Sequence, residues 1–198
     1  KTACGQPPGE MTSGGYADLP TDVQTELSES NVDFILEKGT DVNVGNTPPD
    51  ITGTYLLDSF DFGNSSYSSE NKEEGYLLRF EVDPASGKLT FEMSDLDPSP
   101  IPEIYRSNDV VVTGSGNSFT AFAGFLAGAP DQTPTSTLHV FSGTLREDGL
   151  ADLSAFACTY SEELGFEGGL DVTSPDGRKH GAFRVSEETD GIAARQTE

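Results

Sequence analysis

Beyond residue 50, hydrophobic and polar residues alternate with a period of two, which is the pattern of β-strands with one buried face. The clearest example is 76–83, where Tyr76, Leu78, Phe80 and Val82 share one face. Ala85-Ser86-Gly87 then predicts a tight turn into a second alternating segment, so the two form a hairpin. The remaining predicted strands are 53–60, 88–94, 109–114, 118–126, 137–145, 150–160 and 181–186, with a weaker candidate at 166–172.

Short turns separate these strands, and no helical crossover lies between them. Gly114-Ser115-Gly116-Asn117 and Asp148-Gly149 are turn sequences, and Asp-Gly is a strong hairpin signal. Consecutive strands joined in this way run antiparallel. The sequence therefore predicts an all-β fold, an antiparallel up-and-down barrel of about eight strands, because closure removes exposed sheet edges. A β-sandwich is the alternative.

The pattern before residue 50 is different. Residues 1–20 are rich in Gly and Pro, which predicts a flexible arm or tether. Thr21 and Gln24 have the spacing of a capping box, and Val23 and Leu27 share a helix face, so we expect one short helix over about 21–29. The alternation in 31–38 predicts an initial strand or extended segment. Residues 21–198 are thus expected to form a single β domain.

Two predicted strands, 119–126 and 150–160, are apolar on both faces. One face must belong to the core, and the other is expected to contact the helix, the arm or a partner. Four aromatic residues are expected inside the barrel, where they either fill the core or surround a small ligand. They are Phe80, Phe91, Phe119 and Phe156.

Charge narrows the range of partners. The chain has 34 acidic and 11 basic residues and a formal net charge of −23. Nucleic acids and anionic lipid surfaces require clusters of Lys and Arg, so neither is an expected partner. The longest apolar run, 121–129, is interrupted by Gly124 and Gly128 and is too short for a transmembrane segment.

The first residues indicate export. Lys1-Thr2-Ala3-Cys4-Gly5 resembles the junction left by a removed export signal. Cys4 is the position for a lipid anchor, as in a bacterial lipoprotein, whereas in an oxidising compartment Cys4 and Cys158 can form a disulfide. Both alternatives remain open. The expected location is periplasmic, outer-membrane-anchored or extracellular.

Two resemblances extend this interpretation. Gly53-Thr54-Tyr55 resembles the first strand of lipocalin-like (calycin) domains, where G-x-W begins the barrel and a basic residue of the last strand packs near the ring. Tyr55 replaces the Trp here, and the resemblance implies Arg184 as its basic partner. Because first and last strands become neighbours only when the sheet closes, we expect Tyr55 and Arg184 to meet at one end of the fold.

The second resemblance is to a group of exported bacterial lipoproteins of the Bacteroidetes type. It rests on 45–49 with Gly53 and Tyr55, on 114–120, on 141–144 with Asp148-Gly149, and on Arg184 with 190–193. This resemblance implies export and a β fold.

Catalytic chemistry has few candidates. His139 alternates with apolar residues in a predicted strand, His180 adjoins Arg178 and Lys179, and neither is near a nucleophile motif. Acidic pairs such as Asp58 with Asp61 lack the spacing of a Ca²⁺-binding loop. We therefore expect no cofactor, no metal and no enzymatic activity.

The leading hypothesis is an exported, non-catalytic β-barrel module that binds an unknown small ligand or protein partner. A structural or assembly protein, which associates with further copies through the arm or an edge strand, is the alternative. A hydrolase is third.

Overall fold

The structure is a computed structural model that describes residues 14–27, 29–65, 74–96, 104–108, 110–127, 135–161, 183–188 and 191–196. Its helices are η1 (Tyr16–Asp18), α1 (Thr21–Glu26) and α2 (Glu29–Glu37). Its strands are β1 (Asn46–Thr47), β2 (Gly53–Ser65), β3 (Glu74–Val82), β4 (Leu89–Asp95), β5 (Ile104–Ser107), β6 (Val110–Ser115), β7 (Ser118–Ala127), β8 (Thr135–Leu145), β9 (Gly149–Ser161), β10 (Phe183–Glu188) and β11 (Ile192–Gln196).

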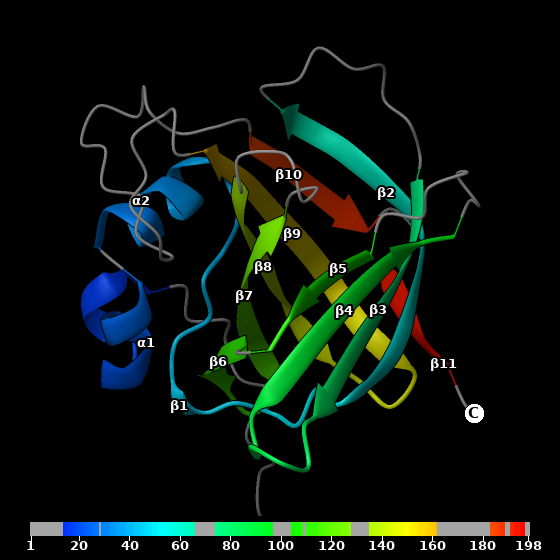
Figure 1. Cartoon of the computed structure of the whole chain (residues 1–198), viewed down its shortest axis with the longest axis horizontal. Helices are drawn as coiled ribbons and strands as arrows, with labels where there is room; N and C mark the ends of the chain where they lie inside the picture. The colour runs from blue at the N-terminus through cyan, green and yellow to red at the C-terminus, as the bar shows by residue number, and fades with distance from the viewer. Residues whose placement is uncertain are drawn as a thin grey trace, which may run out of the picture.

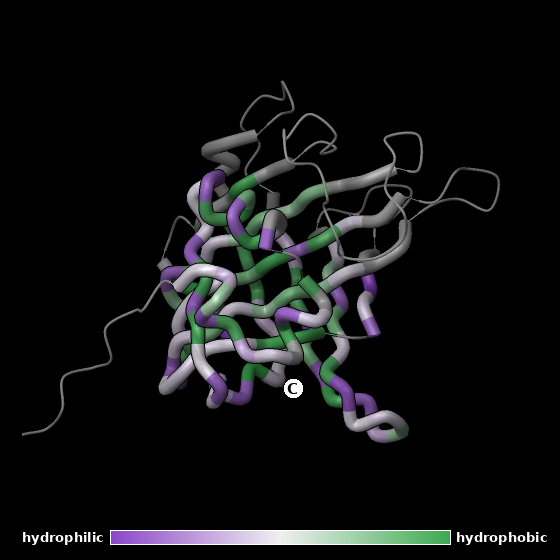
Figure 2. Tube along the Cα trace, turned by 90° about the vertical axis from the view of Figure 1, so that its left-hand side faces the viewer, coloured by the Kyte–Doolittle hydropathy of each residue, from purple (hydrophilic) through white to green (hydrophobic). Residues whose placement is uncertain are grey.

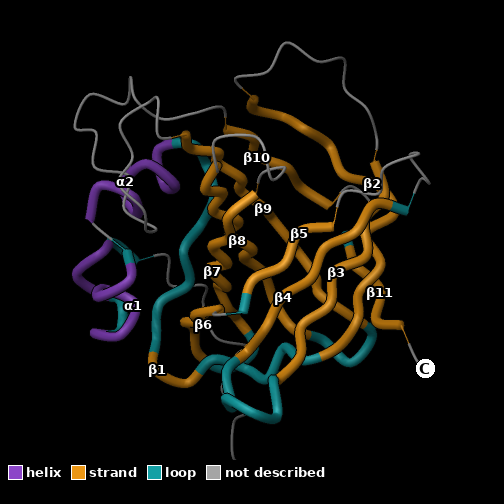
Figure 3. The backbone as a smooth tube through the Cα atoms, in the orientation of Figure 1, coloured by secondary structure: helices purple, strands orange, loops and turns teal. Residues whose placement is uncertain are grey.

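All of these strands belong to one sheet, which curls into a half-barrel (Figures 1 and 3). The strand order is β1-β6-β7-β8-β9-β10-β2-β3-β4-β5. Every pairing is antiparallel except that of β1 with β6, so the sheet is mixed. The all-β prediction is confirmed, whereas the closed antiparallel barrel of about eight strands is not. The hydrogen-bonded order ends at β5 on one side and at β1 and β6 on the other.

The first long strand and the last strands are neighbours. β10 and β11 both lie between β9 and β2 and pair with both of them, so they occupy one position of the sheet end to end. The predicted adjacency of first and last strands is therefore present. The break in the ladder falls in mid-sequence, between β5 and β6.

The half-barrel has two distinct ends. At one end, which we call the turn end, short connections join β3 to β4, β6 to β7 and β8 to β9. At the other, the far end, register brings together the ends of the remaining strands. Ala127 pairs with Thr135, Thr135 with Ser161, and Arg184 with Ser65.

The sheet separates two apolar clusters. The inner cluster lies inside the curl and includes Tyr55, Leu78, Phe80, Phe119 and Phe141. The outer cluster lies on the opposite face of β7 to β10, where helices cover it (Figure 1). Hydrophobic residues follow the strands through the body of the molecule in Figure 2. The outer cluster consists of Leu19, Val23, Leu27, Val32, Phe34, Ile35, Val42, Phe122, Leu138, Val140, Phe156, Cys158 and Val185.

The covering segment is the described part of 14–45, which we call the helical cover. It comprises η1, α1, α2 and the extended residues that follow them. Strands apolar on both faces were expected to meet a helix, the arm or a partner, and the helical cover fills this place. Of the predicted arm, residues 14–20 belong to the cover through η1 and the buried Leu19. Residues 1–13 lie outside the described residues.

Three local predictions differ from the structure. The predicted helix over 21–29 is α1, which ends at Glu26. Gln24 does not form the capping box; its side chain donates to the carbonyl oxygens of Leu19 (2.8 Å) and Tyr16 (3.2 Å). The predicted extended segment 31–38 is wrong, because α2 occupies Glu29–Glu37.

The remaining predicted strands match β2, β3, β4, β6, β7, β8, β9 and β10 within a few residues, apart from the length of β2. Three strands were missed, β1, β5 and β11, because each is short and has few large apolar residues. The weak candidate at 166–172 lies outside the described residues.

Candidate functional site

The inner face near the turn end is filled by aromatic rings. Phe80 lies 5.1 Å from Phe91 and 6.2 Å from Phe141, measured between ring centroids. Phe91 and Phe141 are 5.1 Å apart, and Tyr55 meets Phe80 edge-on at 6.4 Å. These are the separations that aromatic pairs prefer. This half of the interior is a packed core.

Tyr55 and Arg195 close the turn end below this core. The Tyr55 hydroxyl donates to the carbonyl oxygen of Ile51 at 3.0 Å. Arg195 on β11 donates through Nη2 to the Tyr55 hydroxyl (2.9 Å) and to the carbonyl oxygen of Thr52 (3.0 Å). Its guanidinium also lies 5.5 Å from the centre of the Tyr55 ring, a cation–π distance. The start of β2 is thereby held against the last strand.

Asp50 extends this cluster to the surface. Its carboxylate accepts hydrogen bonds from the backbone N–H (3.0 Å) and the hydroxyl (2.8 Å) of Thr52. These bonds lower the pKa of Asp50, and the charge of Arg195 contributes a smaller lowering, against the opposing effect of partial burial. The negative charge of Asp50 is thus favoured in the folded state.

The interior toward the far end has smaller and more polar residues. His139 pairs in register with Ala123 on β7 and Ala157 on β9, so it faces the interior, where it is 7% exposed. Thr137 is two residues away on the same face of β8 and is also buried. The His139 ring lies beside Phe91 (6.4 Å) and Phe141 (6.0 Å), measured between ring centroids.

Ala155 and Ala157 are only half-buried, unlike the aromatic residues of the turn end. Both lie on the inner face of β9, and Ala155 packs against the inner cluster. Because β8 and β10 flank β9 on either side, the exposed surface of these two residues faces the interior of the curl. The inner face therefore keeps accessible surface at Ala155 and Ala157, beside the buried His139.

Three of the four predicted interior aromatics lie inside. Phe80, Phe91 and Phe119 belong to the inner cluster. Phe156 is a correction, because it lies in the outer cluster, edge-on to Phe34 of α2 at 5.8 Å between ring centroids.

A β-bulge explains the position of Phe156. Asp152 has φ of 51° and breaks the register of β9, so that Ser142 pairs with Ser154 while Thr144 pairs with Ala151. One extra residue in a strand inverts the facing of all that follow it. Gly143 lies opposite this bulge, and a Cβ atom there would be 2.9 Å from the carbonyl oxygen of Ala151. Reading the alternation onward from Leu150 therefore gives the wrong face for Phe156.

Arg184 is not the partner of Tyr55. Its backbone pairs with Ser65 and Ala157, whereas Tyr55 pairs with Arg195. Ser65 lies ten residues beyond Tyr55 on β2, a separation of about 33 Å along an extended strand. Arg195 takes the predicted role. β11 has few large apolar residues, so the period-two pattern gave no signal for the role of Arg195.

The cysteines bear on anchoring. Cys158 is fully buried in the outer cluster. Cys4 lies outside the described residues, so both the disulfide and the lipid anchor stay predictions. His180 also lies outside them. Among the described residues, no group of three or more His, Cys, Asp or Glu side chains is placed to hold a metal ion.

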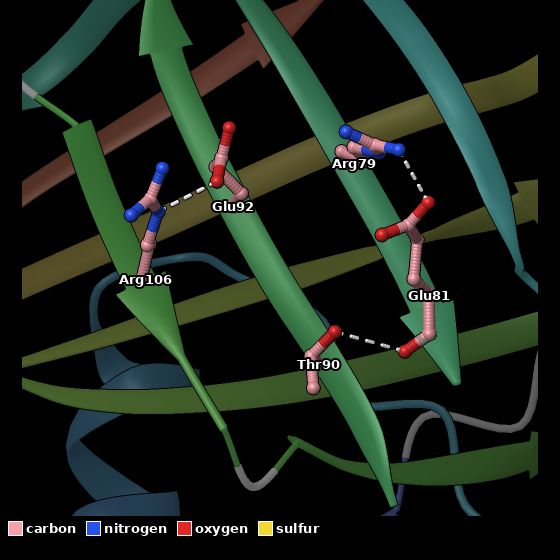
Figure 4. A network of polar contacts seen from close by, with 5 residues as sticks. All are labelled: Arg79, Glu81, Thr90, Glu92 and Arg106. Carbon is pink, nitrogen blue, oxygen red and sulfur yellow. Dashed lines mark hydrogen bonds and ion pairs between the residues drawn. The ribbon is translucent and has the colours of Figure 1, made fainter. Parts of the chain in front are cut away.

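The uncovered outer face of the half-barrel is charged. On β3, β4 and β5 it presents two short ion pairs, Arg79–Glu81 and Arg106–Glu92, each at 2.6 Å (Figure 4). Thr90 donates to the carbonyl oxygen of Glu81 at 3.0 Å. Arg106 and Glu81 are largely exposed, so these pairs contribute little stability. The arrangement is that of a solvated surface.

Comparisons with protein-family models, curated proteins and solved structures gave no match. None of the helices in the described ranges combines the length and the hydropathy that crossing a membrane requires. The candidate site is therefore assigned from the geometry of the structure alone. It is the far half of the inner face, formed by Thr137, His139, Ala155 and Ala157 beside Phe91.

Proposed function

We propose that this chain is an exported, non-catalytic binding module that takes up a small molecule in the far half of its interior. One observation carries the proposal: Ala155 and Ala157 are half-buried on an inner face that elsewhere is filled by aromatic rings. Binding sites are typically mostly apolar, concave and supplied with a few polar groups. Here the curl of the sheet supplies the concave shape, and His139 and Thr137 supply the polar groups.

The lipocalin-like resemblance is part of the same proposal. The contact of Tyr55 with Arg195 supports it, because an aromatic residue at the start of the first strand packs against a basic residue of the last. β5 and β6 are not hydrogen-bonded to each other, and in this respect the sheet departs from a closed barrel. Export, with a lipid anchor at Cys4, belongs to the proposal through the resemblance to exported bacterial lipoproteins.

One edge of the sheet favours binding over the assembly alternative. β5, one end of the strand order, has only four residues and carries the exposed Arg106. Short, charged edge strands resist pairing with a neighbouring chain. The inward facing of Thr137, His139, Ala155 and Ala157 follows from the register of β8 with its neighbours.

The test uses N-phenyl-1-naphthylamine, a neutral apolar dye whose fluorescence rises in apolar surroundings. We expect the wild-type chain to bind it saturably and Ala157→Leu to reduce binding at least ten-fold, because the larger side chain fills the accessible space. Ala194→Leu is the matched control, since Ala194 is exposed on β11. Thermal unfolding of each variant verifies the fold. Absence of binding by the wild type, or equal binding by Ala157→Leu, would contradict the proposal.

A further inference from the structure

The helical cover holds itself together. Near its two ends, the backbone N–H of Gly14 donates to the carbonyl oxygen of Val42 at 3.1 Å. Between them, the Tyr16 hydroxyl donates to the carbonyl oxygen of Gln24 (2.9 Å), and the Gln24 side chain returns a bond to the carbonyl oxygen of Tyr16 (3.2 Å). These contacts join η1, α1 and the extended residues into one unit.

A buried polar cluster attaches this unit to the sheet. The backbone N–H of Asn43 donates to the Thr120 hydroxyl at 2.8 Å. Its side-chain amide donates to the carbonyl oxygen of Phe119 (3.0 Å) and to the Ser142 hydroxyl (2.9 Å). Asn43, Thr120 and Ser142 are all buried. Breaking these bonds without access of water would be costly, so they fix the position of the cover while it is closed.

The sheet side of this cluster keeps partners of its own. The Thr120 and Ser142 hydroxyls lie 2.8 Å apart and bond each other, and the Ser142 hydroxyl is 3.4 Å from the carbonyl oxygen of Phe119. If the cover moves away, the Thr120 and Ser142 hydroxyls retain their hydrogen bond to each other. The other polar atoms that Asn43 had contacted become accessible to water. Detachment therefore leaves no stranded polar group on the sheet.

Three features make the cover less stable than the sheet. Its two α-helices have six and nine residues, lengths at which isolated helices do not persist. Neither has a basic residue in its last turn, and at the end of α2 the charge of Lys38 is offset by the adjacent Glu37, with which it pairs at 2.8 Å, so the helix dipole gains no net positive charge there. The Thr40 hydroxyl is buried with no hydrogen-bond partner, a cost that opening would relieve.

The inner cluster does not depend on the cover. The inner and outer clusters share no residue among those described, because the sheet lies between them. The strand ladders from β7 to β10 are formed by backbone hydrogen bonds within the sheet itself. Loss of the cover removes packing from one face of the sheet only.

We propose that the helical cover opens as one cooperative unit from an intact half-barrel, with the Asn43 cluster as the contact that keeps it closed. Opening uncovers the apolar outer face of β7 to β9, including Phe122, Phe156 and Cys158. This is a built-in conformational switch of the outer face, separate from the binding site proposed inside. Partial unfolding of a less stable unit is an established behaviour of native proteins.

The test follows the labelling rate of the Cys158 thiol by an aromatic disulfide reagent under native conditions, in a Cys4→Ser background where Cys158 is the sole cysteine. We expect Asn43→Ala to raise this rate at least ten-fold, because it removes both hydrogen bonds of the side-chain amide, and the net contribution of a single hydrogen bond corresponds to a factor of up to about ten. Leu78→Ala, in the inner cluster, is the control. We expect it to lower the urea midpoint of the whole protein but to raise the native-state labelling rate of Cys158 less than Asn43→Ala does.

A second variant acts in the opposite direction. Thr40→Val keeps the shape of the side chain and removes the unpaired hydroxyl, so we expect slower labelling of Cys158 by a few-fold. Hydrogen exchange should likewise show faster exchange in 14–45 than in β7 and β8. An unchanged rate in Asn43→Ala or Thr40→Val, or labelling that follows global unfolding in every variant, would overturn the proposal.

Discussion

Arg195 joins the last strand to the first residue of the aromatic core through its contacts with Tyr55. It donates a hydrogen bond to the Tyr55 hydroxyl at 2.9 Å and lies over the ring at 5.5 Å. The same guanidinium bonds the carbonyl oxygen of Thr52, which precedes β2. One side chain therefore links the two strands whose adjacency closes this side of the half-barrel.

We expect Arg195→Ala to lower the free energy of unfolding by about 1–2 kcal/mol, because a partly buried hydrogen bond to Tyr55, an exposed one to Thr52 and a cation–π contact are lost. Urea unfolding measures this effect. Arg106→Ala is the matched control, since its ion pair with Glu92 is exposed, and its cost should be below about 1 kcal/mol. Equal effects in the two variants would mean that the Tyr55 contact contributes no special stability.

Asp50 should make the same end of the fold sensitive to acid. Its pKa is lowered in the folded state by the hydrogen bonds from Thr52. A lowered folded-state pKa gives stability that is present above the unfolded value, about 3.9 for Asp, and is lost as pH falls through the folded value. We expect Asp50→Asn to be less stable than wild type at pH 7, with the difference shrinking below about pH 4.

Urea unfolding of both proteins at pH 7 and at pH 3 measures this change. The other carboxylates titrate in both proteins, so the difference between the two isolates Asp50. A difference that stays constant or grows toward low pH would show that the charge of Asp50 is not favoured by folding.

The period-two pattern located most strands because it is a direct consequence of strand geometry. Hairpin turns such as 83–88 could also be predicted from the sequence, because Asp83 accepts hydrogen bonds from the backbone of Ala85 and Ser86 within its own turn. Such features depend on neighbours in sequence. Pattern and turn chemistry together were sufficient for the all-β class.

Features that depend on contacts between residues far apart in the sequence could not be predicted from the sequence. Val32, Phe34 and Leu36 alternate like a strand, yet Val32 and Ile35 also share a helix face, and burial against the sheet selects the helix. The role of Arg195 depends on a strand with few large apolar residues. The candidate site was predicted in part, because Phe80, Phe91 and Phe119 lie in the interior as expected and Phe156 does not. The half-buried Ala155 and Ala157 have no distinguishing pattern in the sequence.

The bulge at Asp152 determines which residues of β9 face the interior, and this gives the last prediction. Asp152 has a left-handed backbone conformation (φ 51°), which Asp tolerates and β-branched residues do not. We expect Asp152→Gly to change the free energy of unfolding by less than about 1 kcal/mol and Asp152→Val to lower it by about 1–3 kcal/mol. Urea unfolding compares the two.

Deletion of Asp152 is the sharper form of this test. Without the extra residue, β9 alternates without interruption. The residues on one side of the former bulge must then face the opposite way and lose their present contacts. Either Phe156 turns to the interior, where Phe91 and Phe141 already pack, or Leu150 turns outward from the inner cluster. Each exchange places large and small residues in the wrong layer, so we expect the deletion variant to lose cooperative unfolding. A cooperative transition at the wild-type urea midpoint would show that the bulge does not set the facing of β9.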